Sequence, residues 1–249
     1  MVEVVIGGVQ KCGTSALHKY LQRHPQIVGG SKKELHFFDD LSVNWIHPDY
    51  AAYEAMFPDH DAGQMRLDAS PSYIYLPECL ERLKCYNPDV RLIFIFRDPI
   101  ERAWSHWSMV RLRGFETLSF DEAVKAERDR LAAFSKGDIA YKRYAYVDRG
   151  NYGYQFARAL KLFPREQMLC LASEALRADP DSVLARVADH LGIAPFTPAP
   201  SIEANKGPGK PIQMAPKTRS FICNTLRDDI RRFSDLSGVD TLHWEIFQG

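Results

Sequence analysis

The chain has 249 residues, of which 45% are hydrophobic and 26% charged, as is ordinary for a soluble globular protein with a sizeable core. Lysine and arginine together number 32, as do aspartate and glutamate, so the zero net charge gives no support for bulk binding to nucleic acid or to an anionic membrane. No apolar run approaches the length of a membrane span, and the N-terminus has neither the basic nor the apolar region of a signal peptide.

These features predict a single cytoplasmic domain over residues 1–249, with no nucleic-acid or membrane partner. The five cysteines are irregularly spaced, and their spacing indicates neither a disulfide framework nor a zinc site. We therefore expect reduced thiols and no bound metal.

Short apolar runs alternate along the chain with longer stretches of helical spacing. Strands are expected at 2–9, 34–38, 90–96 and 167–172. Helices are expected at 15–24, from 77 to about 87, from 99, at 119–134, at 155–163, at 179–191 and from about 217 to 234. This alternation predicts a three-layer α/β fold, in which helices cover both faces of a parallel sheet.

In such a sheet, ligands bind at the carboxyl ends of the strands. The loop after the first strand is glycine-rich and contains Lys11, Cys12, Gly13, Thr14 and Ser15. Glycines let the backbone approach an anion, and the N–H groups of the following helix point at it. A Walker A loop ends in Gly-Lys-Ser/Thr, whereas here the lysine precedes the last glycine. The loop therefore predicts phosphate binding but argues against an ordinary ATPase.

A second candidate anion site follows the strand at 90–96. Arg97 comes directly after this strand and offers a guanidinium fork to a phosphate, and Ser105 lies two turns into the following helix. The alternative for Arg97 is a pair with a surface carboxylate. In a P-loop ATPase this strand would end in a carboxylate for magnesium, and Asp98 is the alternative candidate for that role.

Three segments together resemble the sulfotransferases that use 3′-phosphoadenosine 5′-phosphosulfate (PAPS). They are the loop at 8–15, Lys-Glu-Leu-His-Phe-Phe-Asp at 33–39, and Arg-Asp-Pro-Ile-Glu-Arg-Ala-Trp-Ser at 97–105. The second segment, with Ser-Pro-Ser-Tyr at 70–73, is similar to the heparan-sulfate-type branch and its bacterial relatives. Some members place a lysine just before the latter motif, where this chain has Asp68 and Ala69, so a cofactor or acceptor contact is missing or supplied elsewhere. The resemblance covers most of the chain and implies the P-loop-NTPase-like sulfotransferase fold.

The resemblance also implies roles for single residues. Glu34 matches the catalytic base of the family, and His36 either shares this role or orients and packs. Lys11 would stabilise the leaving phosphate, and Arg97 with Ser105 would hold the 3′-phosphate. The 5′-phosphosulfate would be bound by Lys11, Cys12, Gly13, Thr14, Ser15 and Ala16. A late basic loop over the cofactor would contain Lys206, Gly207 and Lys210.

The residue types suit sulfuryl transfer, in which a base takes the proton of the acceptor while a phosphate departs. A positioned carboxylate is typically worth about 10²–10⁴-fold in rate. Burial beside Phe37 and Phe38 would raise the pKa of Glu34, whereas Lys32 and Lys33 would lower it, and the sequence leaves this balance open. The scheme needs no metal.

We therefore predict an enzyme that moves the sulfuryl group of PAPS to a hydroxyl, or less readily an amine, of a carbohydrate or small natural product by in-line displacement. The product of the cofactor would be 3′-phosphoadenosine 5′-phosphate (PAP). Two alternatives stay open, a P-loop-like kinase or NTPase and a non-catalytic nucleotide-binding module. The sequence leaves open the acceptor, the oligomeric state and the role of the Pro/Gly-rich loop at 195–216.

Overall fold

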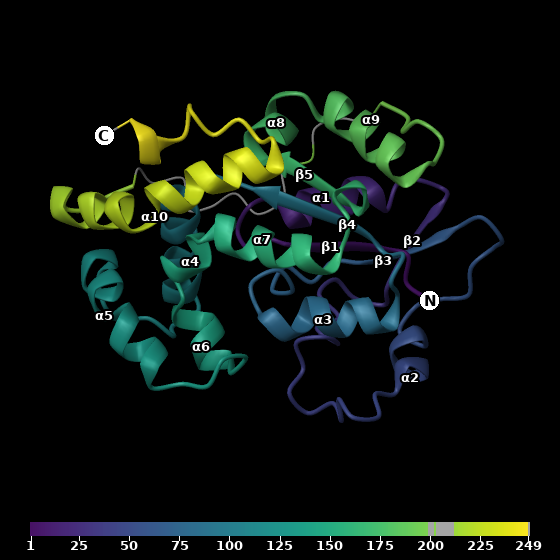
Figure 1. Cartoon of the computed structure of the whole chain (residues 1–249), viewed down its shortest axis with the longest axis horizontal. Coiled ribbons are helices and arrows are strands. Elements are labelled where there is room, and N and C mark those ends of the chain that lie inside the picture. The colour runs from purple at the N-terminus through teal and green to yellow at the C-terminus, as the bar shows by residue number, and fades with distance from the viewer. Residues whose placement is uncertain (199–201, 203–211, 249) are drawn as a thin grey trace. The chain divides into compact units, whose positions relative to one another are not determined.

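The computed structural model describes residues 1–198, 202 and 212–248 (Figure 1). By its internal contacts the chain divides into two compact units. The first unit consists of residues 1–96 and 158–204, and the second of residues 97–157 and 205–249. Every strand of the described chain belongs to the first unit, and the described part of the second unit is helical.

The first unit is built on a five-stranded parallel sheet with the strand order β2-β3-β1-β4-β5. Its strands are β1 (Val4–Gly8), β2 (Ile27–Gly29), β3 (Met65–Asp68), β4 (Arg91–Phe96) and β5 (Met168–Ala172). All residues of β1 are buried, as are all those of β4 except Arg91. Because successive side chains of a strand point to opposite faces, both faces of the central strands are covered. The predicted α/β fold with a parallel sheet is confirmed.

The prediction of a short strand at 34–38 is wrong. This segment is irregular, and Glu34 and His36 have positive φ angles of 63° and 59°, which a strand does not allow. Two short strands that the sequence did not predict, β2 and β3, complete the sheet instead. They were missed because each has only three or four residues and neither forms a continuous apolar run.

The helices of the first unit are α1 (Thr14–Leu21), α2 (Tyr50–Glu54), α3 (Pro77–Tyr86), α8 (Ser173–Ala178) and α9 (Pro180–Leu191). Three of them, α1, α3 and α9, were predicted from the sequence, whereas the short helices α2 and α8 were not. Pro77 and Pro180 occupy first-turn positions, where a missing N–H costs no hydrogen bond. Helix α9 ends at Gly192, whose φ of 66° suits glycine. Helix α7 (Tyr152–Leu162) begins in the second unit and ends in the first.

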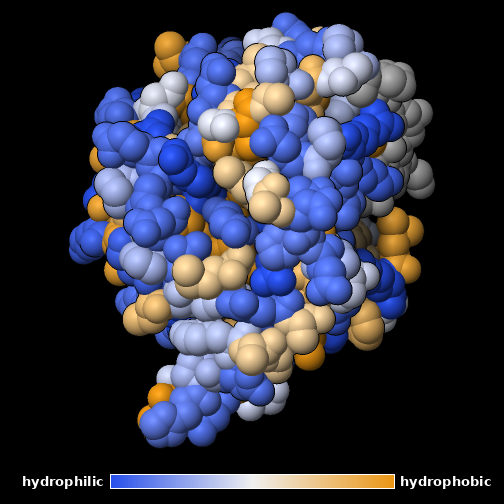
Figure 2. All heavy atoms as spheres, turned by 90° about the vertical axis from the view of Figure 1, so that its right-hand side faces the viewer, coloured by the Kyte–Doolittle hydropathy of each residue, from blue (hydrophilic) through white to orange (hydrophobic). Residues whose placement is uncertain are grey.

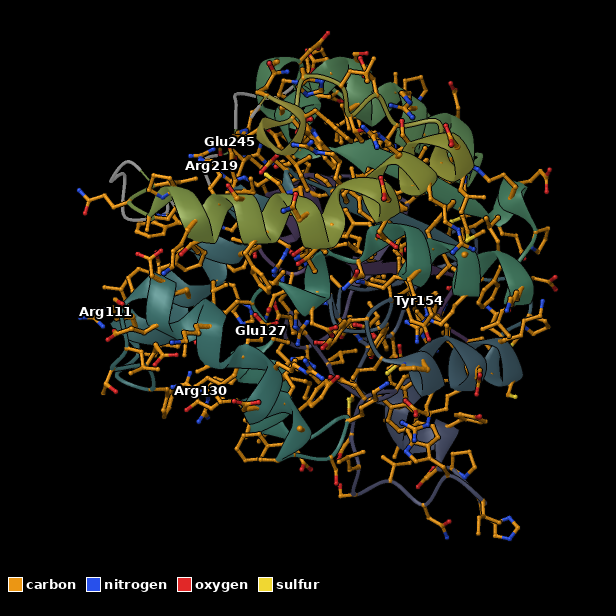
Figure 3. All side chains as sticks on the ribbon, turned by 60° about the vertical axis from the view of Figure 1, so that its left-hand side comes forward. Arg111, Glu127, Arg130, Tyr154, Arg219 and Glu245 are labelled. Carbon is orange, nitrogen blue, oxygen red and sulfur yellow. The ribbon has the colours of Figure 1, made fainter. Side chains whose placement is uncertain are left out.

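The second unit contains α4 (Pro99–Leu112), α5 (Phe120–Ala132), α6 (Ile139–Tyr144) and α10 (Pro216–Ser237), with short 3₁₀ turns at Asp148–Gly150 and Glu245–Phe247. The capping box predicted from Ser119 and Glu122 is present at the start of α5. Arg219 of α10 pairs with Glu245, and both are labelled in Figure 3. The rings of Tyr152, Phe233 and Trp244 pack together in the core of this unit.

Apolar side chains lie mainly inside each unit. The fully buried residues include Ile6 and Phe94 in the sheet of the first unit and Phe233 in the second. Figure 2 shows one face of the molecule, on which hydrophilic residues predominate and hydrophobic ones are scattered. In the described part of the chain, no helix is both long and apolar enough to cross a membrane.

Glu127, labelled on α5 in Figure 3, is a buried carboxylate that holds a turn of the second unit. It accepts hydrogen bonds from the backbone N–H groups of Val147, at 2.7 Å, and Asp148, at 2.8 Å. Burial raises the pKa of Glu127 to about 7, although these hydrogen bonds and the charge of Arg102 act in the opposite direction.

A pKa that is higher in the folded protein than in the unfolded chain means that the folded state binds the proton more tightly. The contribution of Glu127 is therefore present below pH 4.5 and is lost as the pH rises through about 7. We expect Glu127→Gln to reduce the pH dependence of the free energy of unfolding between these limits by up to about 3 kcal/mol. Urea unfolding of both proteins at pH 4.5 and 7.5 measures this, and equal pH dependence in the two would contradict it.

Candidate active site

The glycine loop between β1 and α1 has the backbone geometry of an anion site. A Cβ atom on Gly8 would lie 2.4 Å from Cγ2 of Ile74, so only glycine allows this close approach. Lys11 and Gly13 have left-handed φ angles of 71° and 100°. The loop then enters α1, whose first turn presents N–H groups that the helix cannot pair internally.

The residues of this loop differ in exposure. Cys12 is fully buried and Thr14 nearly so, which places the Cys12 thiol in the core. The other four predicted loop residues are half-buried, namely Lys11, Gly13, Ser15 and Ala16. A ligand on this loop would therefore meet backbone N–H groups and the Lys11 side chain before it met the thiol.

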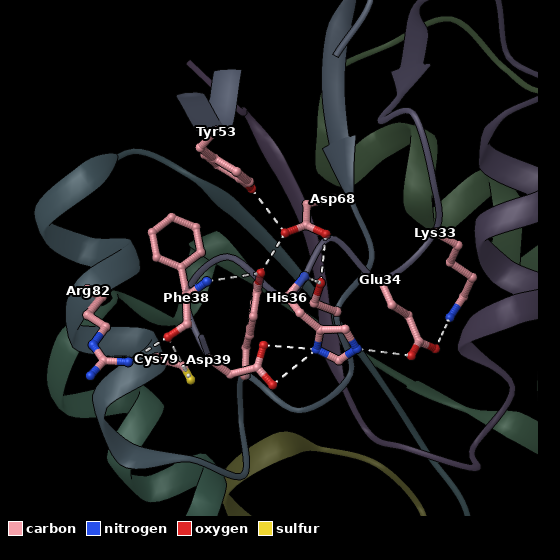
Figure 4. Close-up of polar contacts among 11 residues, drawn as sticks. Lys33, Glu34, His36, Phe38, Asp39, Tyr53, Asp68, Cys79 and Arg82 are labelled. Atoms are coloured by element: carbon pink, nitrogen blue, oxygen red, sulfur yellow. Dashed lines mark hydrogen bonds and ion pairs between the residues drawn. The ribbon is translucent and has the colours of Figure 1, made fainter. Parts of the chain in front are cut away.

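Figure 4 shows a row of alternating charges in residues 33–39 of the first unit. Nζ of Lys33 lies 2.5 Å from Oε1 of Glu34, and Oε2 of Glu34 lies 3.4 Å from Nε2 of His36. Nδ1 of His36 is 2.9 Å from Oδ1 of Asp39. The two cations and two carboxylates thus compensate one another within four side chains. Lys33 was expected from the sequence to lower the pKa of Glu34, whereas Asp39 was given no role although it belongs to the quoted motif.

The charges in this row determine the protonation of the two candidate bases. Burial alone would raise the pKa of Glu34, but the hydrogen bond from His36 and the charge of Lys33 outweigh it and lower the pKa to about 2. Hydrogen bonds to Asp39 and Glu34 raise the pKa of His36 to about 9, against the effect of burial. At neutral pH His36 is therefore an imidazolium and has no free nitrogen to accept a proton. Glu34 is ionised and is the group that can act as a base.

Helix α1 lies close to this row of charges. Its buried His18 has a pKa lowered to about 4, first by burial and then by the positive charge of Lys33, while the charge of Glu34 acts in the opposite direction. The Glu34 carboxylate is therefore within electrostatic range of the helix that follows the glycine loop. The first unit brings the predicted base and the predicted anion loop into one region.

The second unit contains the other predicted cofactor residues. Arg97 follows β4 directly, and its guanidinium lies 2.5 Å from Oε2 of Glu101, which is the carboxylate pair given as its alternative role. Its carbonyl accepts a hydrogen bond from the hydroxyl of Tyr152. Ser105 lies in the second turn of α4 and is half-buried. Lys206, Gly207 and Lys210 lie outside the described residues.

Asp98 acts as the N-cap of α4. Its Oδ1 accepts hydrogen bonds from the N–H groups of Ile100 and Glu101, and its Oδ2 accepts one from Ile246. Burial raises its pKa, while these hydrogen bonds act in the opposite direction. Both oxygens are thus engaged in structure, which does not support the magnesium role given as its alternative. Among the described residues, no group of three or more His, Cys, Asp or Glu side chains is arranged to hold a metal.

Comparison with known proteins gives consistent matches. The family model described as "Sulfotransferase domain" matches residues 2–203. Heparan sulfate glucosamine 3-O-sulfotransferase 3B1 is 32% identical over 198 residues in Mus musculus (77% of this chain and 46% of that protein) and 30% identical over 219 residues in Homo sapiens (84% and 50%). The chain thus spans about half the length of the curated relatives that it matches.

Solved structures agree with this result. A sulfotransferase from Alicyclobacillus acidocaldarius superimposes with a TM-score of 0.81 at 26% identity, over 98% of both chains. The sulfotransferase domain of the Synechococcus PCC 7002 olefin synthase has the same fold, with a TM-score of 0.55 at 15% identity over 96% of this chain and 95% of that chain. The glycine loop, the Glu34 region and these matches together show that the chain belongs to the sulfotransferase family.

Proposed function

We propose that the chain is an enzyme that transfers the sulfuryl group of PAPS to a carbohydrate hydroxyl by in-line displacement. The observation that supports this most directly is the ionised Glu34 carboxylate, held by Lys33 and His36 in the same unit as the glycine loop. Relatives named as glucosamine 3-O-sulfotransferases support a sugar hydroxyl over an amine or a small natural product. A kinase or NTPase is not favoured, because the loop lacks the final Gly-Lys-Ser/Thr order.

The residues of the glycine loop fit the 5′-phosphosulfate of PAPS. The N–H groups at the start of α1 suit an anion, and we assign this ligand to Lys11, Cys12, Gly13, Thr14, Ser15 and Ala16. Arg97 and Ser105 are assigned to the 3′-phosphate, for which the guanidinium would exchange Glu101 for the ligand. Lys206, Gly207 and Lys210 are assigned to the same cofactor on the resemblance alone.

When bound, PAPS supplies an activated sulfuryl group whose leaving group is the phosphate of PAP. Glu34 takes the proton of the acceptor hydroxyl on a carboxylate oxygen, and His36 keeps that carboxylate oriented by donating a hydrogen bond to it. Lys11 and the N–H groups of the loop stabilise the negative charge that grows on the departing phosphate. This scheme uses no metal.

We propose that both units form one sulfotransferase domain over residues 1–249. The cytoplasmic location expected from the sequence stays a prediction, as does the absence of a nucleic-acid or membrane partner. The acceptor is to be identified by assay, with heparan sulfate as the first probe.

The assignment of Arg97 to the 3′-phosphate predicts the affinity for PAP. Removing a charge-assisted hydrogen bond to a phosphate costs about 1.5–3 kcal/mol, so Arg97→Ala is expected to weaken PAP binding by about 10- to 100-fold in calorimetric titration. Glu101→Gln is the matched control, because it removes the partner of Arg97 in the structure and leaves the guanidinium for the ligand. Equal effects of both variants, or tighter binding of magnesium-ATP than of PAP by the unaltered protein, would contradict the assignment.

The role of Glu34 predicts a loss of turnover without a loss of cofactor binding. Glu34→Gln keeps the size of the side chain but cannot take a proton, so kcat for PAPS-dependent sulfation of heparan sulfate should fall about 10²–10⁴-fold. The Kd for PAP should stay within about twofold in calorimetric titration. If the variant loses PAP binding instead, Glu34 belongs to the cofactor site and its assignment as base is wrong.

The pKa values of Glu34 and His36 predict the pH dependence of catalysis. Glu34 stays ionised and His36 stays protonated from about pH 5 to about pH 8. We therefore expect kcat to be constant over this range and to fall as the pH rises through about 9, where His36 loses the proton with which it orients Glu34. The measurement is kcat at saturating PAPS from pH 5 to pH 10. A loss of tenfold per pH unit below about 6.5 would instead identify an unprotonated histidine as the base.

A further inference from the structure

Asp68, the last residue of β3, is a buried carboxylate that accepts hydrogen bonds from three hydroxyl groups. Ser70 donates to Oδ1 at 2.9 Å, while Tyr73 and Tyr53 donate to Oδ2 at 2.8 Å and 3.0 Å (Figure 4). Burial raises the pKa of Asp68, and these three hydrogen bonds act in the opposite direction. A buried carboxylate is kept in a folded protein only where donors of this kind compensate it.

Two of the three hydroxyl groups also contact the backbone of residues 34–39, which we call the catalytic segment. The N–H group of His36 donates to Oγ of Ser70 at 3.1 Å, and that of Phe38 donates to the hydroxyl oxygen of Tyr73 at 3.4 Å. A hydroxyl has one proton, and in each case that proton is directed to Asp68. Each relay therefore runs in one direction, from a backbone N–H through a hydroxyl to the same carboxylate.

The catalytic segment needs such support because its backbone is in an unfavourable conformation. Glu34 and His36 have φ angles of 63° and 59°, and neither residue is a glycine. Left-handed backbone is unfavourable at residues other than glycine and persists only where surrounding contacts hold it. The segment belongs to no strand, so the sheet does not supply its hydrogen bonds. The hydroxyls bound to Asp68 supply two of them.

We propose that Asp68, acting through Ser70 and Tyr73, is a positioning residue that fixes His36 and thereby the Glu34 carboxylate for proton transfer. The catalytic part of this inference rests on the proposed function. Asp68 has no contact of its own with Glu34 among the hydrogen bonds drawn in Figure 4. It orients the hydroxyl of Ser70, Ser70 holds the backbone of His36, and the ring of His36 donates to Glu34. Asp68 thus acts on the catalytic segment through other residues.

Ser70→Ala tests the inference, because it removes the relay between Asp68 and His36 and adds no bulk. Ser72→Ala is the matched control, since Ser72 is equally buried in the same turn and its carbonyl pairs with Tyr75 and Leu76. Ser70→Thr restores a hydroxyl and should rescue the wild-type behaviour. Asp68→Asn is a second variant, in which an amide donor replaces one of the acceptor oxygens. Should it fail to fold, Ser70→Ala still decides the question.

The first measurement is the pKa of His36 by NMR, assigned by comparison with a His36→Gln spectrum. In wild-type protein and in Ser72→Ala the pKa of His36 should be near 9. In Ser70→Ala it should be at least one unit lower, because the hydrogen bonds of His36 to Glu34 and Asp39 are weakened. The second measurement is sulfation of heparan sulfate at saturating PAPS. A misplacement of about 1 Å costs up to about 100-fold, so kcat should fall by about that factor while the Kd for PAP stays within about twofold.

An unchanged pKa of His36 in Ser70→Ala, or equal kcat in Ser70→Ala and Ser72→Ala, would overturn the inference. So would a loss of kcat that is matched by lost PAP binding and a lower melting temperature, because the relay would then serve folding alone. Failure of the proposed function looks different, since wild-type protein would then neither bind PAP nor sulfate any acceptor. The NMR titration does not depend on turnover and tests the relay in that case as well.

Discussion

The compensation of one half-buried carboxylate determines how the first unit is arranged around its candidate site. Glu34 lies in the same unit as the loop proposed to bind an anion, and positive charge beside a half-buried carboxylate stabilises its ionised form. Lys33 and His36 supply this charge, and Asp39 keeps His36 protonated in turn. The result is a candidate base whose pKa is lowered to about 2 beside a histidine whose pKa is raised to about 9.

The surroundings of this row follow from the same constraint. The backbone passes through two left-handed residues, Glu34 and His36, and the hydroxyls that converge on Asp68 accept hydrogen bonds from this segment. Aromatic rings pack the other side, with Phe37 stacked on Tyr53 at 4.5 Å between ring centroids. On the neighbouring side, Gly8 brings the loop close to Ile74 and leads the chain into α1. Packed aromatic rings and hydrogen-bonded polar groups thus both contact the segment that contains the candidate base.

Much of this could be predicted from the sequence, and the exceptions are instructive. The long apolar runs that became β1, β4 and β5 were recognisable because each is continuous and flanked by helical spacing. The motif around Glu34 and His36 supplied the candidate base and its neighbour, which stay predictions, but the segment was expected to be a strand and is not one. The two side chains do lie near each other, as predicted, but for a different reason. A strand would have placed them on one face, whereas in the structure two positive φ angles bring them together.

The sequence by itself determined the parallel α/β class and the glycine loop, since these depend on local residue order and hydrophobic periodicity, and it named Glu34 and His36 as candidates. Only the tertiary structure decided whether burial or charge controls the pKa of Glu34, because that balance depends on distances between side chains. It also decided the partners of Asp68, where Tyr53 of α2 meets Ser70 and Tyr73 beyond the end of β3. Such convergence of distant segments has no local signature, because hydrogen-bond geometry is set by packing rather than by spacing along the chain.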